Sequence, residues 1–330
     1  MLNTTLNLHI KAQKPLISPE KLINSLALSQ TAIETVVNAR ETISNILQAR
    51  DNRLLVIVGP CSIHDTGAAL EYAEKLKTLA SSLEDELFIV MRTYFEKPRT
   101  TIGWKGLIND PHIDGSFNIE EGLKISRQFL IDLNNMGVAA ATEALDPILP
   151  QYLQDLICWS AIGARTTESQ VHRAMASGLS MPVGFKNTTS GDVLVAVNAL
   201  KSANSPHSFL GIDTAGKVSV VHTTGNDDTH VILRGGGGTS NYSESDIGQC
   251  ETMLSEHALA PNIMVDCSHA NSNKDHNNQP KVLAEVERCQ KIIKSNGIAP
   301  GAMSTDIDYI KMLKEKKYQF LFSVLYHLHY

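Results

Sequence analysis

The sequence predicts an α/β protein built as a (β/α)8 barrel of the TIM type. Short, nearly continuous apolar runs recur along the chain, amphipathic helix-like segments separate them, and 330 residues suit one large barrel. The eight runs lie at residues 54–62, 87–92, 138–145, 161–165, 181–186, 230–235, 262–269 and 297–303. Such strands are typical of a parallel sheet buried on both faces, and eight of them favour a closed barrel. The last run, GIAPGAM, has the weakest strand pattern.

Two segments lie outside this alternation. Residues 1–50 precede the first strand and are predicted to be an N-terminal extension with helices over residues 17–50. Ser18 followed by Pro19 is a typical helix start. Residues 209–223 read as a β-hairpin that turns around Thr214-Ala215-Gly216, inserted between the fifth and sixth strands. Residues 51–330 are then the barrel domain.

Composition limits the classes of function. The net charge is −6 and the pI is near 6.1, which does not suggest a nucleic-acid or membrane surface. No run of about 18 apolar residues predicts a membrane span. The five cysteines are scattered, without zinc-finger spacing, and no signal peptide is recognisable. Free thiols in the cytoplasm are the expectation.

Cationic side chains stand at the ends of four predicted strands: Arg92, Arg165, Lys186 and Arg234. The carboxyl ends of barrel strands converge on one mouth, where active sites lie. Like charges placed together are costly unless anions neutralise them, so a substrate set with phosphates and a carboxylate is expected. Each arginine alone would equally suit a structural ion pair; the repetition at strand ends favours a site.

Three further features lie near the same mouth. The loop with Lys97, Pro98, Arg99 and Thr100 offers a second phosphate site, or else a solvated basic turn. The four glycines at 235–238 would let backbone approach a ligand, but a flexible connector explains them equally well. Cys61 and His269 end the first and seventh runs, and could hold a transition metal, although a lone buried Cys is usually inert. Strand alternation would put Cys267, and not Asp266, on the face of His269.

Five motifs carry a resemblance to a known family: GPCSIHD (59–65), RTYFEKPRTTIGWKGLINDPH (92–112), GARTTESQVHR (163–173), PVGFKN (182–187) and DCSHANSNK (266–274). They resemble type I 3-deoxy-D-arabino-heptulosonate-7-phosphate (DAHP) synthase, also called phospho-2-dehydro-3-deoxyheptonate aldolase. The resemblance runs from about residue 15 to about residue 290. It implies a transferase that joins phosphoenolpyruvate, D-erythrose 4-phosphate and water, releasing phosphate, as the first step of the shikimate pathway to aromatic amino acids.

The resemblance also implies roles for individual residues. The residues implied to bind phosphoenolpyruvate are Arg92, Lys97, Glu143, Arg165, Lys186 and Arg234. Those implied to bind erythrose 4-phosphate are Lys97, Pro98, Arg99 and Thr100. Cys61 and His269 would hold a divalent metal ion that polarises the aldehyde, and with Lys97 they form the implied catalytic set.

Regulation and assembly are implied as well. Family members are commonly inhibited by tyrosine or phenylalanine, at a site between the N-terminal extension, the loop 146–151, the turn 178–180 and the hairpin. Pro150, Gln151 and Ser180 are the implied inhibitor residues, and the segments ATEALDP (141–147) and SGLSMP (177–182) look more like tyrosine-sensitive members. A simpler reading is that these residues pack the extension. The extension would also contribute to a homodimer or homotetramer.

The chain departs from the family from about residue 297 onward. The family supplies a Glu and an Asp as further metal ligands there, and neither motif is found; Asp306 and Asp308 do not match them. The segment 311–330 is lysine-rich and then aromatic, as a frameshifted gene end or a divergent helix would be. We therefore hypothesise weakened metal binding and activity. Two alternatives stay open: a catalytically impaired barrel that senses ligands or partners a subunit, and the related synthase that uses arabinose 5-phosphate.

Overall fold

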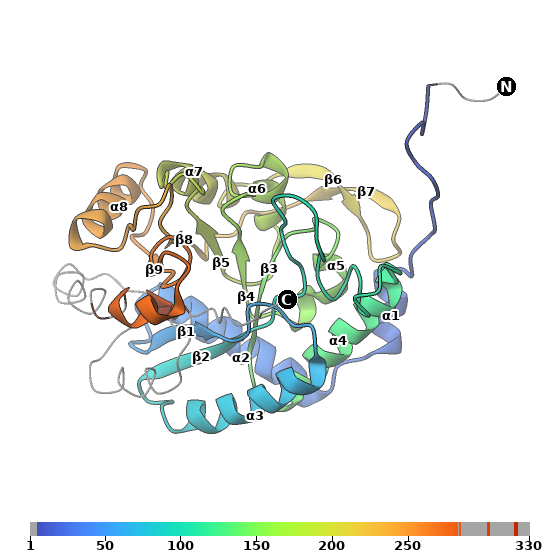
Figure 1. The fold of residues 1–330 in the computed structure, drawn as a ribbon, viewed down its shortest axis with the longest axis horizontal. Coiled ribbons are helices and arrows are strands. Elements are labelled where there is room, and N and C mark those ends of the chain that lie inside the picture. The colour runs from blue at the N-terminus through green and yellow to red at the C-terminus, as the bar shows by residue number, and fades with distance from the viewer. Residues whose placement is uncertain (1–4, 283, 285–301, 304–319, 323–330) are drawn as a thin grey trace.

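The protein is a barrel-type α/β structure with a parallel sheet at its centre and helices around it (Figure 1). The computed structural model describes residues 5–282, 284, 302–303 and 320–322. Seven strands lie at predicted positions: β1 (Leu54–Val58), β2 (Leu87–Arg92), β3 (Ala140–Glu143), β4 (Trp159–Ile162), β5 (Val183–Lys186), β8 (Thr229–Leu233) and β9 (Ile263–Val265). Each pairs in parallel with the next in this order. The predicted parallel α/β class is confirmed.

Two short strands extend the sheet beyond β1. β11 (Phe320–Phe322) pairs in parallel with β1, and β10 (Ala302–Met303) pairs in parallel with β11. β9 and β10 are the two ends of the sheet order, and Cα atoms of β9 come within 8 Å of those of β10 and β11. β10 falls in the predicted eighth run. β11 was not predicted, because three residues are too few to show a strand pattern; the rest of 297–330 lies outside the described residues.

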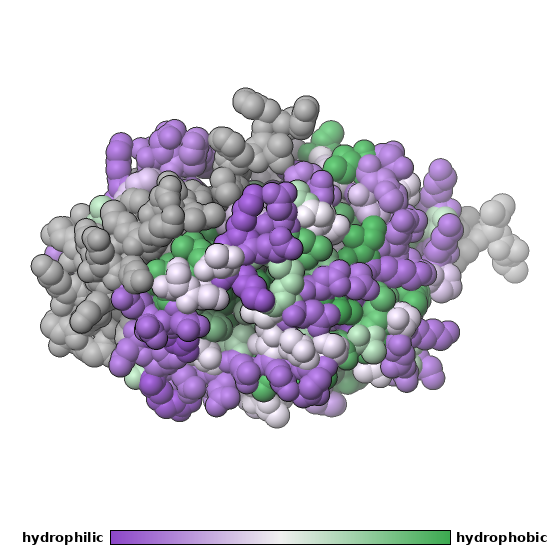
Figure 2. Space-filling view, turned by 90° about the horizontal axis from the view of Figure 1, so that it is seen from below, coloured by the Kyte–Doolittle hydropathy of each residue, from purple (hydrophilic) through white to green (hydrophobic). Residues whose placement is uncertain are grey.

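Helices follow most strands, as the alternating pattern predicts. They are α3 (Thr66–Ser81), α4 (Ile119–Asn135), α5 (Pro150–Leu153), the 3-10 turn η1 (Gln154–Leu156), α6 (Gln170–Ala176), α7 (Leu194–Ala203), α8 (Glu244–Glu256) and the 3-10 turn η2 (His276–Asn278). In Figure 1, α3 and α4 lie below the strands and α6, α7 and α8 lie above them. On the face seen from below, hydrophilic and hydrophobic residues are interspersed (Figure 2).

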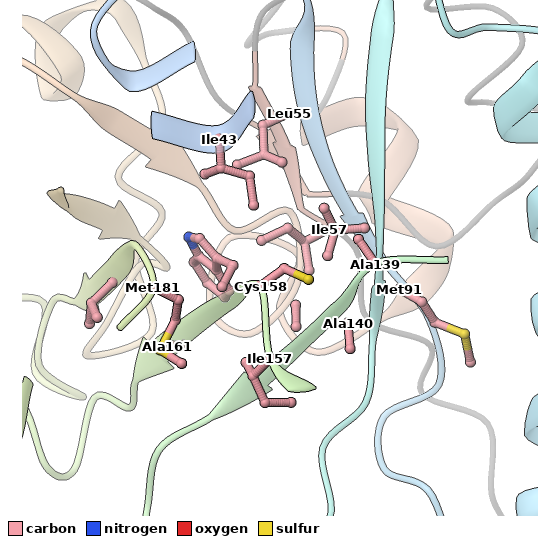
Figure 3. Close-up of a cluster of buried hydrophobic side chains, with 14 of the residues drawn as sticks. Ile43, Leu55, Ile57, Met91, Ala139, Ala140, Ile157, Cys158, Ala161 and Met181 are labelled. Carbon is pink, nitrogen blue, oxygen red and sulfur yellow. The ribbon is translucent and has the colours of Figure 1, made fainter. Parts of the chain in front are cut away.

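The segment before β1 forms two helices, α1 (Pro19–Ser25) and α2 (Gln30–Leu47). Ser18 caps α1, as predicted, and Ser29 caps α2, so the predicted helical region is interrupted between them. Ile43 of α2 is fully buried, and Figure 3 shows it beside Leu55 of β1 in the hydrophobic cluster of the barrel. Helix α2 therefore shares its core with the sheet.

A buried arginine also joins the first helices to the rest. Arg127 of α4 donates to the carbonyl of Leu26, to the carbonyl of Tyr152 and, with two nitrogens, to Asp155. Its side chain is fully buried. A charge without water is stable only when its donors are satisfied in this way. The contact ties α4 and the end of α1 to the α5–η1 segment.

The predicted hairpin is present as β6 (Ser208–Ile212) and β7 (Val218–His222), paired antiparallel in a separate two-stranded sheet. Gly216 in its turn has φ 77°, a left-handed conformation that favours glycine. The hairpin lies at the edge of the barrel, above α1 and α5 in Figure 1.

A large buried pair fills the barrel interior. Nε1 of Trp159 on β4 donates to Nε2 of His230 on β8 at 3.3 Å, and both side chains are fully buried. Burial lowers the pKa of His230 to about 3, so the ring is neutral. The two rings meet across β5 at Gly184, where a Cβ atom would lie 2.7 Å from His230 Nε2 and 2.8 Å from Trp159 Cζ2. Glycine is therefore required at this position by packing.

Replacing Gly184 with alanine should destabilise the fold. The added Cβ would also meet Ile232 Cδ1 at 2.6 Å, and overpacking of this kind costs about 1–3 kcal/mol of unfolding free energy. The matched control is Gly248→Ala in α8, where an added Cβ meets nothing within 4 Å; it should be neutral or stabilising, because alanine favours helix. Urea unfolding of both variants measures this. A Gly184→Ala protein as stable as the control would contradict the packing account.

Candidate active site

Three cationic side chains are buried together at the carboxyl ends of the strands. Arg92 is the last residue of β2, Lys186 is the last residue of β5, and Arg234 follows β8 directly. Their exposed fractions are 5%, 4% and 8%. The prediction that strand ends gather cations is confirmed for these three. Burial of like charges is unfavourable by itself, so the site favours anionic ligands.

Cys61 and Lys97 extend this cluster. Lys97 Nζ lies 2.9 Å from Cys61 Sγ, and a guanidinium nitrogen of Arg92 donates to the Cys61 carbonyl at 2.9 Å. Burial raises the pKa of the Cys61 thiol, but the positive charges of Arg92 and Lys97 outweigh it and lower the pKa overall. These charges therefore favour the thiolate form, which is the form of cysteine that binds metal ions.

A buried carboxylate joins Lys186 to His269. Asp266 Oδ2 lies 3.1 Å from Lys186 Nζ and 2.7 Å from His269 Nδ1. Burial would raise the pKa of Asp266, but His269 and Lys186 hold it well below its usual range. Burial lowers the pKa of His269 to about 4, so its ring is neutral and Nε2 can offer a lone pair. Metal-binding histidines are typically oriented through such a contact with a carboxylate.

The sequence did not single out Asp266. Strand alternation placed Cys267 on the face of His269, whereas the structure shows a contact between the Asp266 carboxylate and His269 Nδ1. β9 ends at Val265 and His269 has φ 54°, so the alternation of a strand does not extend over these residues. Cys267 is fully buried, while Asp266 contacts His269.

Asparagine side chains hold the backbone that carries the cationic residues. The sequence analysis did not predict them. Asn187 Oδ1 accepts the backbone N–H of Arg234 at 2.7 Å and the side-chain amide of Asn241 at 3.1 Å. Asn271 donates to the carbonyls of Leu233 and Asp266. Asn187 directly follows β5, which was the available signal, whereas Asn241 and Asn271 lie further along the loops after β8 and β9. They fix the backbone that carries Arg234 and Asp266.

Arg165 takes a different position from the other strand-end cations. β4 ends at Ile162, so Arg165 lies in the following turn and its side chain is exposed. It donates to Thr100 Oγ1 at 3.0 Å and to the Pro98 carbonyl at 3.4 Å. Arg165 therefore connects the turn after β4 with the loop that carries the second predicted phosphate site.

In that loop, Arg99 and Thr100 are exposed and the backbone is held in place. Arg99 Nε donates to the Trp104 carbonyl at 2.7 Å, and the backbone N–H of Lys97 donates to the Lys105 carbonyl at 2.8 Å. Both predicted side chains are thus accessible on a fixed turn. This arrangement suits a phosphate that arrives from solvent.

Glu143 and the glycine loop pack closely against neighbouring backbone. A Cβ atom at Gly163 would lie 2.1 Å from Glu143 Oε1, so the Glu143 side chain would have to shift if a larger residue stood here. A Cβ at Gly236 would lie 2.1 Å from the backbone nitrogen of Gly191, and the Gly237 N–H donates to the Thr189 carbonyl. The close approach that these glycines permit is therefore to the loop 188–191.

Cys61 and His269 suit metal binding, because the thiolate form of a cysteine and an oriented imidazole are both common metal ligands. Both also lie close enough to Lys186 for its charge to act on their pKa values. Among the described residues, no group of three or more His, Cys, Asp or Glu side chains is placed to hold an ion. Two donors would supply only part of the coordination sphere of a metal ion. Asp306 and Asp308 lie outside the described residues.

The four segments of the implied inhibitor site meet in space. The Glu20 N–H donates to the Thr214 carbonyl at 2.8 Å, which joins α1 to the hairpin turn. Tyr152 Oη donates to the Ile17 carbonyl at 2.7 Å, and a Cβ at Gly178 would lie 2.6 Å from Thr223 at the end of the hairpin.

A cavity lies beside two of these segments, the loop 146–151 and the turn 178–180, and beside the end of β3. Its lining residues are Phe95, Thr142, Glu143, Ala144, Leu149, Pro150, Leu153, Gln154, Ile157, Ser160, Leu179 and Met181. Of the three implied inhibitor residues, Pro150 lines it, Ser180 donates to the lining residue Gln154 at 3.5 Å, and Gln151 does not line it.

The same region contacts the loop that carries Lys97. Glu96, which precedes Lys97, accepts the backbone N–H of Asp146 at 3.3 Å. Burial raises the pKa of this carboxyl to about 8. The loop 146–151 is thus linked directly to the residue beside Lys97.

Within the part of the chain that the structure describes, no helix is both long and apolar enough to cross a membrane.

Comparison with known proteins gives a consistent result. The sequence profile of the DAHP synthetase I family matches residues 28–303. The Tyr-sensitive phospho-2-dehydro-3-deoxyheptonate aldolase of Escherichia coli K12 is 57% identical over 280 residues, 85% of this chain and 78% of that protein. The Phe-sensitive enzyme of the same strain is 52% identical over 297 residues, 90% of this chain and 84% of that protein.

A solved structure agrees with both. The phospho-2-dehydro-3-deoxyheptonate aldolase of Francisella tularensis SCHU S4 superposes with a TM-score of 0.87 at 46% identity, covering 93% of this chain and 98% of that one. The fold, the strand-end motifs and these matches all point the same way: the chain belongs to the DAHP synthetase I family.

Proposed function

We propose that this protein condenses phosphoenolpyruvate with D-erythrose 4-phosphate and water, giving 3-deoxy-D-arabino-heptulosonate 7-phosphate and phosphate, the first step of aromatic amino acid biosynthesis. The main observation that supports this proposal is the buried group of Arg92, Lys186 and Arg234 beside Lys97. Phosphoenolpyruvate has a carboxylate and a phosphate, and would neutralise this charge. The names of the relatives support the same reaction.

Each residue then has a part in the chemistry. Arg92, Lys186 and Arg234 bind the phosphoenolpyruvate anion, and Glu143 supports the group. Arg165 adds a further guanidinium and also contacts the loop 98–100, where Pro98, Arg99 and Thr100 bind the phosphate of erythrose 4-phosphate. Holding both substrates removes much of the entropic barrier to attack of C3 on the aldehyde. The ammonium of Lys97 stabilises the oxygen on which negative charge develops.

Removing the Lys97 ammonium should therefore stop turnover. In Lys97→Met, phosphate release from the two substrates should fall by at least about 100-fold, the loss typical of one positioned charge donor. Lys105→Met is the matched control, since Lys105 lies in the same loop with an exposed side chain, and it should keep wild-type activity. A phosphate-release assay measures both. Wild-type rates in Lys97→Met would rule out this role.

Cys61 and His269 would hold a divalent metal ion, which when bound polarises the aldehyde as a Lewis acid. A soft thiolate and an imidazole favour a transition metal over Mg²⁺. The expectation of weakened binding stays a prediction, because only these two donors lie among the described residues.

Metal should accordingly dissociate readily. We expect protein desalted after loading with Mn²⁺ to retain much less than one equivalent of metal by elemental analysis, and to recover activity when Mn²⁺ is added back. Two protein ligands hold an ion less well than four. A full equivalent of metal that survives desalting would contradict this prediction.

We also infer feedback inhibition by tyrosine, or by phenylalanine. The cavity beside Pro150 is lined mostly by apolar residues, and its polar groups are Thr142, Glu143, Gln154 and Ser160. The contact of Glu96 with Asp146 supports a route from this cavity to Lys97.

Ser180→Leu should desensitise the enzyme, because Ser180 lies between the lining residues Leu179 and Met181 and a larger apolar side chain would crowd the cavity mouth. We expect the half-inhibitory tyrosine concentration to rise by about tenfold or more, a change of about 1.4 kcal/mol, with unchanged uninhibited rate. Ser245→Leu, at an exposed position of α8, is the control. Equal inhibition of both variants would place the inhibitor elsewhere.

A homodimer or homotetramer is proposed as well. Leu6, Leu8 and Ile10 are exposed on a segment that extends away from the barrel (Figure 1), and Leu210 and Val220 are exposed on the hairpin. Exposed apolar groups of this kind commonly mark subunit contacts. A cytoplasmic location is also inferred, and the free thiols of Cys61, Cys158, Cys250 and Cys267 support it.

A further inference from the structure

Tyr94 lies at the centre of the cationic site, and the reaction outlined above gives it no part. It follows β2 by two residues and is 2% exposed. The guanidinium carbon of Arg92 lies 3.4 Å from the centroid of its ring. The tyrosine ring is thus stacked directly on the cation that ends β2.

The ring completes the support of Arg92. Nε and one terminal nitrogen of Arg92 donate to the carbonyls of Pro60 and Cys61, at 3.2 Å and 2.9 Å. These bonds fix the guanidinium edge, while the Tyr94 ring fixes its plane. A guanidinium held on its edge and its face presents its remaining donors in one direction.

The hydroxyl of Tyr94 is a separate observation. Its oxygen is buried, and no protein group among the described residues forms a hydrogen bond with it. Buried hydroxyls are nearly always hydrogen-bonded to protein or to ordered water. Burial raises the pKa of this hydroxyl, with the charges of Glu143, Asp266 and Cys61 adding to the effect and Arg92 opposing it, so the group stays a neutral donor.

We propose that Tyr94 is a positioning residue of this site, whose ring orients Arg92 and whose hydroxyl holds a buried water molecule among the charged groups. Polar sites of this kind hold water when further partners are near, and the charges of Arg92, Glu143 and Asp266 are close enough to act on Tyr94. The inference rests on the proposed function, because that reaction consumes one water.

The held water is then the reactant. After C3 has bonded to the aldehyde, C2 is electron-deficient, and the water oxygen forms a bond to C2 while one of its protons passes to a carboxylate such as Glu143. The bond from C2 to the phosphate oxygen then breaks, the C2 ketone forms, and the second proton of the water leaves with phosphate. The proton held by the carboxylate passes to the alkoxide on the former aldehyde carbon. No oxidant or reductant is required.

Two substitutions separate the two roles. Tyr94→Phe keeps the ring under Arg92 and removes the hydroxyl, so we expect the KM for phosphoenolpyruvate to stay within about twofold while kcat falls by at least about tenfold. Tyr94→Leu removes both, so the KM for phosphoenolpyruvate should also rise by about tenfold. Phosphate release measures both constants.

The chain offers a matched control in Tyr72 on α3, whose hydroxyl is likewise buried without a partner among the described residues. Tyr72→Phe should leave kcat and KM unchanged. A crystal structure of the wild type should show an ordered water bonded to Tyr94 Oη, and that of Tyr94→Phe should lack it. If Tyr94→Phe keeps wild-type kcat, as Tyr72→Phe does, the proposal is overturned.

Failure of the proposed reaction can be told apart from failure of this inference. If the wild type releases no phosphate from the two substrates, the proposed function is wrong. Calorimetry of phosphoenolpyruvate binding then still tests whether the Tyr94 ring orients Arg92. Weaker binding by Tyr94→Leu than by Tyr94→Phe favours this role of the ring, and equal binding by both variants overturns it.

Discussion

The burial of positive charge at the carboxyl ends of the strands is the constraint on which the rest of this structure depends. Arg92, Lys186 and Arg234 would be unfavourable there without compensation. The fold provides part of it through Asp266 beside Lys186 and through the carbonyls of Pro60 and Cys61 beside Arg92. We propose that an anionic substrate adds to this compensation.

The supporting groups mostly join segments that are far apart in the chain. Asn187, Asn241 and Asn271 fill the hydrogen-bonding requirements of the strand ends, so the backbone under Arg234 and Asp266 is fixed before a ligand arrives. Such preorganisation lets binding energy act on the reaction and not on rearranging the site. The Tyr94 ring extends the same principle to Arg92.

Much of this was readable from the sequence, for identifiable reasons. Apolar runs and the residues that end them are local, so the strands, the hairpin and the positions of Arg92, Lys186 and Arg234 could be predicted. Contacts made by residues beyond a strand end could not be predicted, because the alternation of side chains between the two faces of a strand no longer applies there. Asp266 was missed because the chain turns at His269, and Arg165 reaches Thr100 only because β4 ends at Ile162. Tyr94 gave no sequence signal, since its proposed role rests on the orientation of its ring and on a buried hydroxyl that has no hydrogen-bond partner among the described residues.

The central claim is that the buried cations and the Lys97–Thr100 loop together select phosphoenolpyruvate and a four-carbon aldose phosphate. The most direct measurement supplies the protein, with Mn²⁺, with phosphoenolpyruvate and equal amounts of erythrose 4-phosphate and arabinose 5-phosphate, and identifies the product by mass spectrometry. The account predicts a seven-carbon sugar-acid phosphate formed in step with phosphate release. An eight-carbon product, or release of phosphate without condensation, would contradict it.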